Sequence, residues 1–483
     1  MARPARAFWP VVATVVIFSA LSIYCAIRSE GFVNGDACMH YLSARFAFSS
    51  PQNFVDVWNR PLVVMLDAVP AWLGGRLAVR LVSLLMALGC GGVAYVLADR
   101  QGVRWPVLAL IFTLGQPILF VHSFSEMTEL PFALLLGLAF LAYQRERLFL
   151  AVALVAWAPL ARPEGFGLVA VLGVALLLRR RWAGIVLLPI PTVLWNLAGW
   201  YLVDSRRPAW RWLIDAWPWA GHSVYGHGQL LAMVGQLPAI VSPMVLPATL
   251  AGIWICFRTA RKHGEGKPDH LRLIALVPLL VLIAHSLLYW LGLMASDGEA
   301  RYLLIAAPFW GVLSALGWEW IFSRLQWSYP VRWAAAAVLV VPIAANAVRP
   351  AVPLQLADDW KIARNIAAWY RANPIHQGYP KVMAAHPAIF YFLDINPYGS
   401  AQAPAWDKPT LRAARPGTIL LWDAKFGPSN SSAERAFSLE EVRSAGWIEL
   451  DVPAARGSHE PDTQRKDGDP GSSWKIFVSR AGW

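Results

Sequence analysis

The chain has 483 residues, of which 57% are hydrophobic and only 15% are charged, and its mean hydropathy is +0.45. These values exclude an ordinary soluble domain and indicate a membrane protein with several spans. The formal net charge is +12. Because the excess of Arg and Lys lies in alternate loops, topology and anionic lipid explain the charge better than nucleic acid does. We expect membrane lipids, and no nucleic acid, among the partners.

Apolar segments recur along the first 349 residues, and a bilayer span needs about 20 such residues. The sequence predicts about eleven transmembrane helices, at 8–27, 76–98, 106–122, 129–143, 148–160, 166–178, 183–202, 230–257, 272–294, 301–322 and 332–349. Segment 230–257 contains three prolines and is expected to be kinked or re-entrant. Whether residues 61–73 form a further re-entrant piece stays open.

The loops alternate in charge. One set is rich in Arg and Lys residues, which are typical of cytoplasmic loops, so we place the N-terminus in the cytoplasm and the chain in a plasma (inner) membrane. The opposite set carries carboxylates: Asp36, Glu126, Glu129, Glu164, Asp204, Asp215, Asp297 and Glu299. A membrane protein that gathers its carboxylates on the outer side is expected to act there.

The composition changes at about residue 354, where long apolar runs stop and charged residues, Pro, Gly and Ser increase. Residues 358–372 have the pattern of an amphipathic helix, and 438–445 begin with a capping box. Short strands are predicted at 381–385, 418–422, 447–450 and 474–479, and a polar loop at 456–472. We therefore divide the chain into a transmembrane domain, 1–353, and a small extracytoplasmic α/β domain, 354–483.

Several short motifs follow one another in the predicted outer loops. Asp36 and Tyr41 follow the first span, and Asn59-Arg60-Pro61-Leu62 precedes the second. Later come the motifs Ser125–Glu129, Ala161–Gly165 and Arg301–Leu304. Their order along residues 8–349 resembles the GT-C glycosyltransferases, in particular the branch that contains the protein O-mannosyltransferases and the lipid A aminoarabinose transferase.

The resemblance implies a polyprenyl-phosphate sugar donor and transfer, with inversion, to a hydroxyl of a glycan, lipid or protein acceptor on the outer face. The donor phosphate is a leaving group that needs cations rather than a proton, whereas the acceptor hydroxyl needs one base. Asp36 is the candidate base, and Arg301, Arg206 and Arg207 are the candidates for holding the donor phosphate. The candidate substrate-binding residues are His40, Tyr41, Arg60, Glu126, Arg162, Glu164 and Tyr302.

This sequence departs from the family pattern in the first outer loop. Many relatives have two adjacent acids there, and this chain has Asp36 followed by Ala37. A second carboxylate role in that loop, including metal binding, is therefore in doubt. No cofactor is established by the sequence, and a divalent metal remains an open alternative.

Each candidate also has a structural interpretation. Asp36 suits a loop or a helix cap, and Glu129 suits the first turn of a helix. Arg162 and Glu164 could form an ion pair that closes a tight turn, and Arg301 could anchor a helix at the interface. The alternative function is a transporter or flippase for a lipid-linked or anionic solute. Transporters commonly show repeated halves, and no repeat is visible here, which favours the enzyme.

Overall fold

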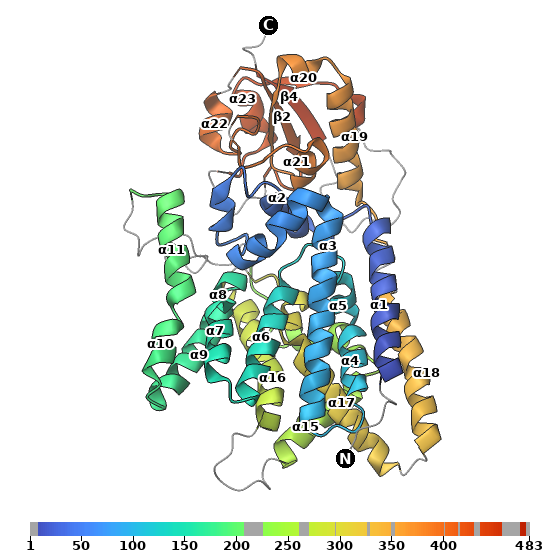
Figure 1. Ribbon diagram of the computed structural model, residues 1–483. Coiled ribbons are helices and arrows are strands. Elements are labelled where there is room, and N and C mark those ends of the chain that lie inside the picture. The colour runs from blue at the N-terminus through green and yellow to red at the C-terminus, as the bar shows by residue number, and fades with distance from the viewer. Residues whose placement is uncertain are drawn as a thin grey trace. The chain divides into compact units, whose positions relative to one another are not determined.

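The structure is a computed structural model, and it describes residues 8–206, 226–259, 270–294, 296–325, 329–348, 353–399, 401–413, 416–428, 435–455 and 474–479. The chain divides into two compact units (Figure 1). The first contains Met1–Arg28 and Pro51–Pro353, and the second contains Ser29–Ser50 and Leu354–Trp483. The sequence assigns residues 29–50 to the transmembrane domain, whereas the structure packs them with residues that follow 353.

The described part of the first unit is helical. Its elements are α1 (Phe8–Arg28), η2 (Pro51–Phe54), α3 (Pro61–Arg100), α4 (Val107–Leu114), α5 (Pro117–His122), α6 (Glu129–Gln144), α7 (Leu148–Ala156), α8 (Ala158–Ala161), α9 (Gly165–Leu178), α10 (Trp182–Leu187), α11 (Ile190–Leu202), α13 (Ala232–Gly235), α14 (Leu237–Val241), α15 (Leu246–Thr259), α16 (His270–Leu291), η5 (Ala300–Ala306), α17 (Ala307–Arg324) and α18 (Tyr329–Val348). Helices α3, α4 and α17 pack against one another at its centre (Figure 1).

Within the described residues, five helices are long and apolar enough to cross a membrane: Phe8–Arg28, Pro61–Arg100, Trp182–Leu202, His270–Leu291 and Ala300–Arg324. The pair Ala232–Val241 and Leu246–Arg258 makes a sixth if it is one broken span. This pair is bent by 108°, so the predicted break within 230–257 is confirmed. Three shorter apolar helices add to the set, at Glu129–Gln144, Leu148–Ala161 and Gly165–Leu178. The helices fit an integral membrane protein, and within the described residues the count of eleven spans is not confirmed.

Helix α3 contains both the second predicted span and the segment 61–73 before it. The two parts meet at Gly75, which has φ 61° and ψ −153° and breaks the helical geometry. An L-residue rarely adopts this conformation, so glycine is needed at the break. Close helix contacts also rely on small residues: a Cβ on Gly252 of α15 or on Gly317 of α17 would overlap backbone of the other helix.

The second unit is built on a four-stranded sheet. Its elements are α2 (Gly35–Arg45), α19 (Asp358–Ala372), α20 (Ile375–Gly378), β1 (Lys381–Ala384), α21 (Pro387–Leu393), α22 (Lys408–Ala413), β2 (Thr418–Asp423), α23 (Leu439–Ser444), β3 (Ile448–Leu450), η7 (Pro453–Ala455) and β4 (Trp474–Val478). The strand order is β1-β2-β4-β3, with β1 and β2 parallel and the other pairs antiparallel.

Local patterning predicts the elements of this sheet well. The helix 358–372 and all four predicted strands are present, and Ser438 and Glu441 form the capping box at the start of α23. One face of the sheet packs on α22 and α23 through a core of Met383, Leu411, Leu420, Trp422, Phe437, Val442, Trp447 and Phe477. The predicted loop 456–472 lies outside the described residues.

Candidate functional site

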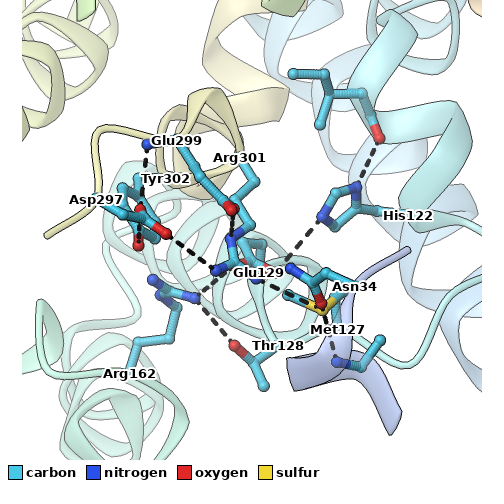
Figure 2. A network of polar contacts seen from close by, with 12 residues as sticks. Asn34, His122, Met127, Thr128, Glu129, Arg162, Asp297, Glu299, Arg301 and Tyr302 are labelled. Atoms are coloured by element: carbon cyan, nitrogen blue, oxygen red, sulfur yellow. Dashed lines mark hydrogen bonds and ion pairs between the residues drawn. The ribbon is translucent and has the colours of Figure 1, made fainter. Parts of the chain in front are cut away.

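A buried network of charged side chains occupies the first unit, and Arg162 is its centre (Figure 2). Arg162 follows α8 and is 5% exposed. Its Nη1 donates to Glu129 Oε1 at 2.8 Å and to Thr128 Oγ1 at 2.9 Å, and its Nη2 donates to Glu164 Oε1 at 3.1 Å. The Arg162 side chain therefore joins the start of α6, where Glu129 lies, to the turn that precedes α9.

Arg301 enters the same network from η5. Its guanidinium is ion-paired with Glu299, and its Nε lies 3.8 Å from Glu129 Oε1. Its Nη2 lies 4.0 Å from Asp297 Oδ2. Glu129 thus lies between two arginines and is itself only 1% exposed. Glu129 is also the first residue of α6, so the same side chain belongs both to the first turn of a helix and to the buried network.

Tyr302 connects the two arginines. The Cζ atoms of Arg162 and Arg301 lie 5.6 Å and 5.5 Å from the centre of its ring, within the range of a cation–π contact. Its hydroxyl donates to Asp297 Oδ1 at 2.5 Å. The ring of His285, from α16, stacks on Tyr302 at 5.2 Å, and its Nε2 lies 3.4 Å from Glu164 Oε1.

The buried network contains more carboxylates than guanidinium groups. Two guanidinium groups, of Arg162 and Arg301, face four carboxylates, those of Glu129, Glu164, Asp297 and Glu299. Charges buried this deeply persist only when they are paired, and at membrane depth they usually serve function. The exposed fraction rises from Glu129 (1%) through Asp297 (23%) to Glu299 (41%), so the network reaches solvent on the side of Glu299.

Glu126 belongs to a separate buried pair. Arg80 Nε, from α3, donates to Glu126 Oε1 at 2.7 Å, and Arg80 Nη1 donates to the carbonyl of Ala26 near the end of α1 at 2.8 Å. Both side chains are 1% exposed or less. Arg80 therefore ties α1 and α3 to the segment 123–128, which leads directly to Glu129.

The other predicted site residues lie elsewhere in the chain. Asp36, His40 and Tyr41 are on α2 in the second unit, with Asp36 in the first turn and the other two buried. Asn34 is the N-cap of this helix, and its Oδ1 accepts from the N–H of Ala37. The structure therefore brings together Arg162, Glu164, Arg301 and Tyr302, and it carries Asp36, His40 and Tyr41 on a different unit.

Of the remaining predicted arginines, Arg60 has an unusual backbone conformation. It precedes α3 with φ 60° and ψ 89°, a conformation that is uncommon for any residue except glycine, and its Nη1 donates to the carbonyl of Val57 at 2.9 Å. Strain of this kind gathers at functional sites. Arg206 is exposed, with its N–H donating to Asp204, and Arg207 lies outside the described residues.

Sequence reasoning did not assign Glu129, His122, His285, Asp297 or Glu299 to the site, although it counted the three acids among the outer carboxylates. His122, at the end of α5, has Nε2 3.8 Å from Glu129 Oε2. A lone ionisable residue inside an apolar segment was the available signal for His285. Among the described residues, no group of three His, Cys, Asp or Glu side chains is arranged to hold a metal ion.

The comparisons with known proteins bear on the fold. No family model matches the chain, and no curated protein matches its sequence. The structure resembles two crystal structures of ArnT from Cupriavidus metallidurans. The apo state matches with a TM-score of 0.57 and 14% identity over 86% of this chain and 93% of that one. The state bound to undecaprenyl phosphate matches with a TM-score of 0.61 and 13% identity over 99% of this chain and 100% of that one.

This likeness shows that the chain shares the fold of ArnT, as the resemblance seen in the sequence predicts.

Proposed function

We propose that this chain is an integral membrane glycosyltransferase that takes a sugar from a polyprenyl-phosphate donor. The observation that carries the proposal is its likeness, over 99% of its length, to ArnT bound to undecaprenyl phosphate. The buried Arg162–Arg301 network supports it independently, because guanidinium groups suit phosphate oxygens. The acceptor is a hydroxyl of a glycan, lipid or protein, and the transfer takes place on the extracytoplasmic face of an inner membrane.

The chemistry needs one base and a site for an anion. The acceptor oxygen attacks C1 of the sugar while the bond from C1 to the phosphate oxygen breaks, so the configuration at C1 inverts. The electron pair leaves with the polyprenyl phosphate, whose charge requires cations but no proton. The proton of the acceptor hydroxyl goes to the Asp36 carboxylate as general base.

Arg301 is the proposed partner of the donor phosphate. In the structure its charge is compensated, chiefly by the Glu299 carboxylate, and Glu299 is the most exposed acid of the network. A phosphate can therefore take the place of Glu299 against Arg301 while Glu129, which is buried, continues to hold Arg162. Arg206 and Arg207 are proposed as further phosphate ligands, and His40, Tyr41, Arg60, Glu126, Arg162, Glu164 and Tyr302 as the surrounding substrate site.

The decisive experiment has two stages. Mass spectrometry of envelope glycans and lipids from cells with and without the chain identifies the sugar and its acceptor. The protein reconstituted in lipid is then given that sugar on undecaprenyl phosphate together with the acceptor. We expect glycosylated acceptor and free undecaprenyl phosphate in equal amounts. A donor that crosses the bilayer intact, with no release of undecaprenyl phosphate, would instead make the chain a flippase.

A further inference from the structure

The segment that carries Asp36 is built into the second unit along its whole length. At its start, the N–H of Gly31 donates to the carbonyl of Leu354 at 2.9 Å, and the N–H of Leu354 donates to Ser29 Oγ at 2.8 Å. A Cβ on Gly31 would collide with the backbone of Gln355, so only glycine allows this approach. At its end, Asn396 Nδ2 donates to Ser50 Oγ at 2.9 Å.

Helix α2 itself packs on α21. Tyr41 contacts Tyr391 of α21 edge to face, with ring centres 5.8 Å apart, and Ser43 is hydrogen-bonded to the hydroxyl of Tyr398. Phe32, just before the helix, lies against both Tyr391 and Trp360. These contacts hold the middle and the end of α2, while Asn34 caps its first turn, which carries Asp36.

The first turn of α2 lies against the turn that follows β2. A Cβ built on Gly35 would lie 3.5 Å from Phe426 Cζ and 4.0 Å from Pro387 Cγ. Phe426 is held in place because Asp423, the last residue of β2, accepts from the N–H of Phe426 at 2.7 Å and from that of Lys425 at 3.1 Å. Asp423 is 3% exposed, so these hydrogen bonds attach the turn to the buried end of β2.

His386 supports Phe426 from the neighbouring strand. It follows β1 and is fully buried, and its ring meets the Phe426 ring edge to face with centres 4.7 Å apart. Its Nδ1 accepts from the N–H of Ala388 at 3.2 Å and so caps α21, while its Nε2 faces Asp359 Oδ2 at 3.4 Å. The ends of β1 and β2, which are parallel neighbours, thus meet under the first turn of α2.

We propose that Phe426, supported by His386, is a positioning residue that sets the place of the Asp36 carboxylate by filling the space beside Gly35 in the first turn of α2. The α/β unit is then part of the catalytic machinery, because it presents the general base. The inference rests on the proposed function for the role of Asp36, whereas the physical coupling between Phe426 and α2 does not depend on it.

The test compares Phe426→Ala with Val442→Ala in the full chain. Val442 is fully buried in the core on the opposite face of the same sheet, so its truncation perturbs the unit away from α2. Phe426→Leu serves as the conservative variant that refills the space. Two quantities are measured: kcat and KM for the donor, and the rate at which a maleimide labels Cys38, a buried native thiol in α2, followed by peptide mass spectrometry.

We expect Phe426→Ala to lower kcat by about 10- to 100-fold with donor KM changed less than about twofold, because a displacement of about 1 Å of a reacting group has costs of that size. Labelling of Cys38 should become several-fold faster. Val442→Ala should change neither quantity, and Phe426→Leu should restore most of kcat. Unchanged Cys38 labelling and kcat in Phe426→Ala would overturn the inference. If the wild type transfers no sugar, the proposed function fails, and Cys38 labelling alone still decides whether Phe426 holds α2.

Discussion

Arg162 and Glu129 are 33 residues apart in the sequence, and their Nη1 and Oε1 atoms are 2.8 Å apart in the structure. Both are almost fully buried, and each has a further partner of opposite charge, Glu164 for Arg162 and Arg301 for Glu129. Loss of one member of such a pair leaves a buried charge uncompensated.

Replacement of Glu129 by Gln should therefore destabilise the protein by about 3 kcal/mol, because Arg162 and Arg301 lose a shared anion. The measurement is thermal unfolding in detergent. Glu319→Gln is the control: Glu319 accepts from the N–H of Arg104 at a more exposed position, and its replacement should cost less than about 1 kcal/mol. Equal melting temperatures for the two variants would show that the Arg162–Glu129 pair adds nothing to stability.

Replacement of Asp36 by Asn should leave folding and donor binding intact and slow transfer by about 10²- to 10⁴-fold, the usual contribution of a general base. The measurement is the rate of acceptor glycosylation at saturating donor. Glu30→Gln is the matched control, since Glu30 lies in the same segment and pairs with Arg364 at an exposed position. Transfer at the wild-type rate in Asp36→Asn would remove Asp36 from the role of base.

Replacement of Arg301 by Ala should weaken binding of undecaprenyl phosphate by about 10-fold or more, because a hydrogen bond to a charged group is lost. Arg301→Lys should recover part of the affinity, since it keeps the charge and loses the planar fork. Binding is measured by native mass spectrometry. Arg324→Ala, at the end of α17, is the control and should bind normally. A larger loss in the double variant of Arg206 and Arg207 than in Arg301→Ala would move the phosphate site to those residues.

The second unit should lose stability in acid as Asp359 titrates. Burial by itself raises the pKa of this carboxyl, but hydrogen bonds from His386 and Lys425 outweigh it and bring the pKa to about 2. A pKa lowered by folding gives stability that is present above the ordinary value, near 4, and is lost as the pH falls toward 2. Wild type and Asp359→Asn should differ by about 2 kcal/mol at pH 5 and converge near pH 2.

Pepsin cleavage within residues 354–483 of the full chain, followed across that pH range, measures this difference. Asp358→Asn is the control, because Asp358 is the neighbouring acid and its side chain is 80% exposed. A gap between wild type and Asp359→Asn that persists unchanged down to pH 2 would contradict the assignment.

Local patterns predicted the four strands of the second unit and its helices at 358–372 and 438–445, because each depends on residues close in sequence. The amphipathic period of 358–372 and the capping box at Ser438 are examples, and both are present. Patterns also predicted the break in 230–257, since proline acts on its own turn. Hydropathy did not separate full-length spans from shorter apolar helices, because shorter helices such as α7 and α9 are apolar as well.

The candidate site, too, was predicted only in part. Arg162, Glu164, Arg301 and Tyr302 were singled out from the sequence because they stand in short motifs that resemble those of the GT-C glycosyltransferases. That they converge on Glu129, with His122 and His285, was not visible, because the contacts join α5, α6, α16 and η5 across long sequence separations.

By itself the sequence determined that this is a helical membrane protein with a small α/β region after residue 353, because composition and short-range periodicity act within each segment. Only the tertiary structure decided that residues 29–50 pack with that α/β region, and that Phe426 and His386 lie under the turn that carries Asp36. These contacts join segments more than 300 residues apart. Their energy comes from ring packing and backbone hydrogen bonds between surfaces that neither segment has on its own.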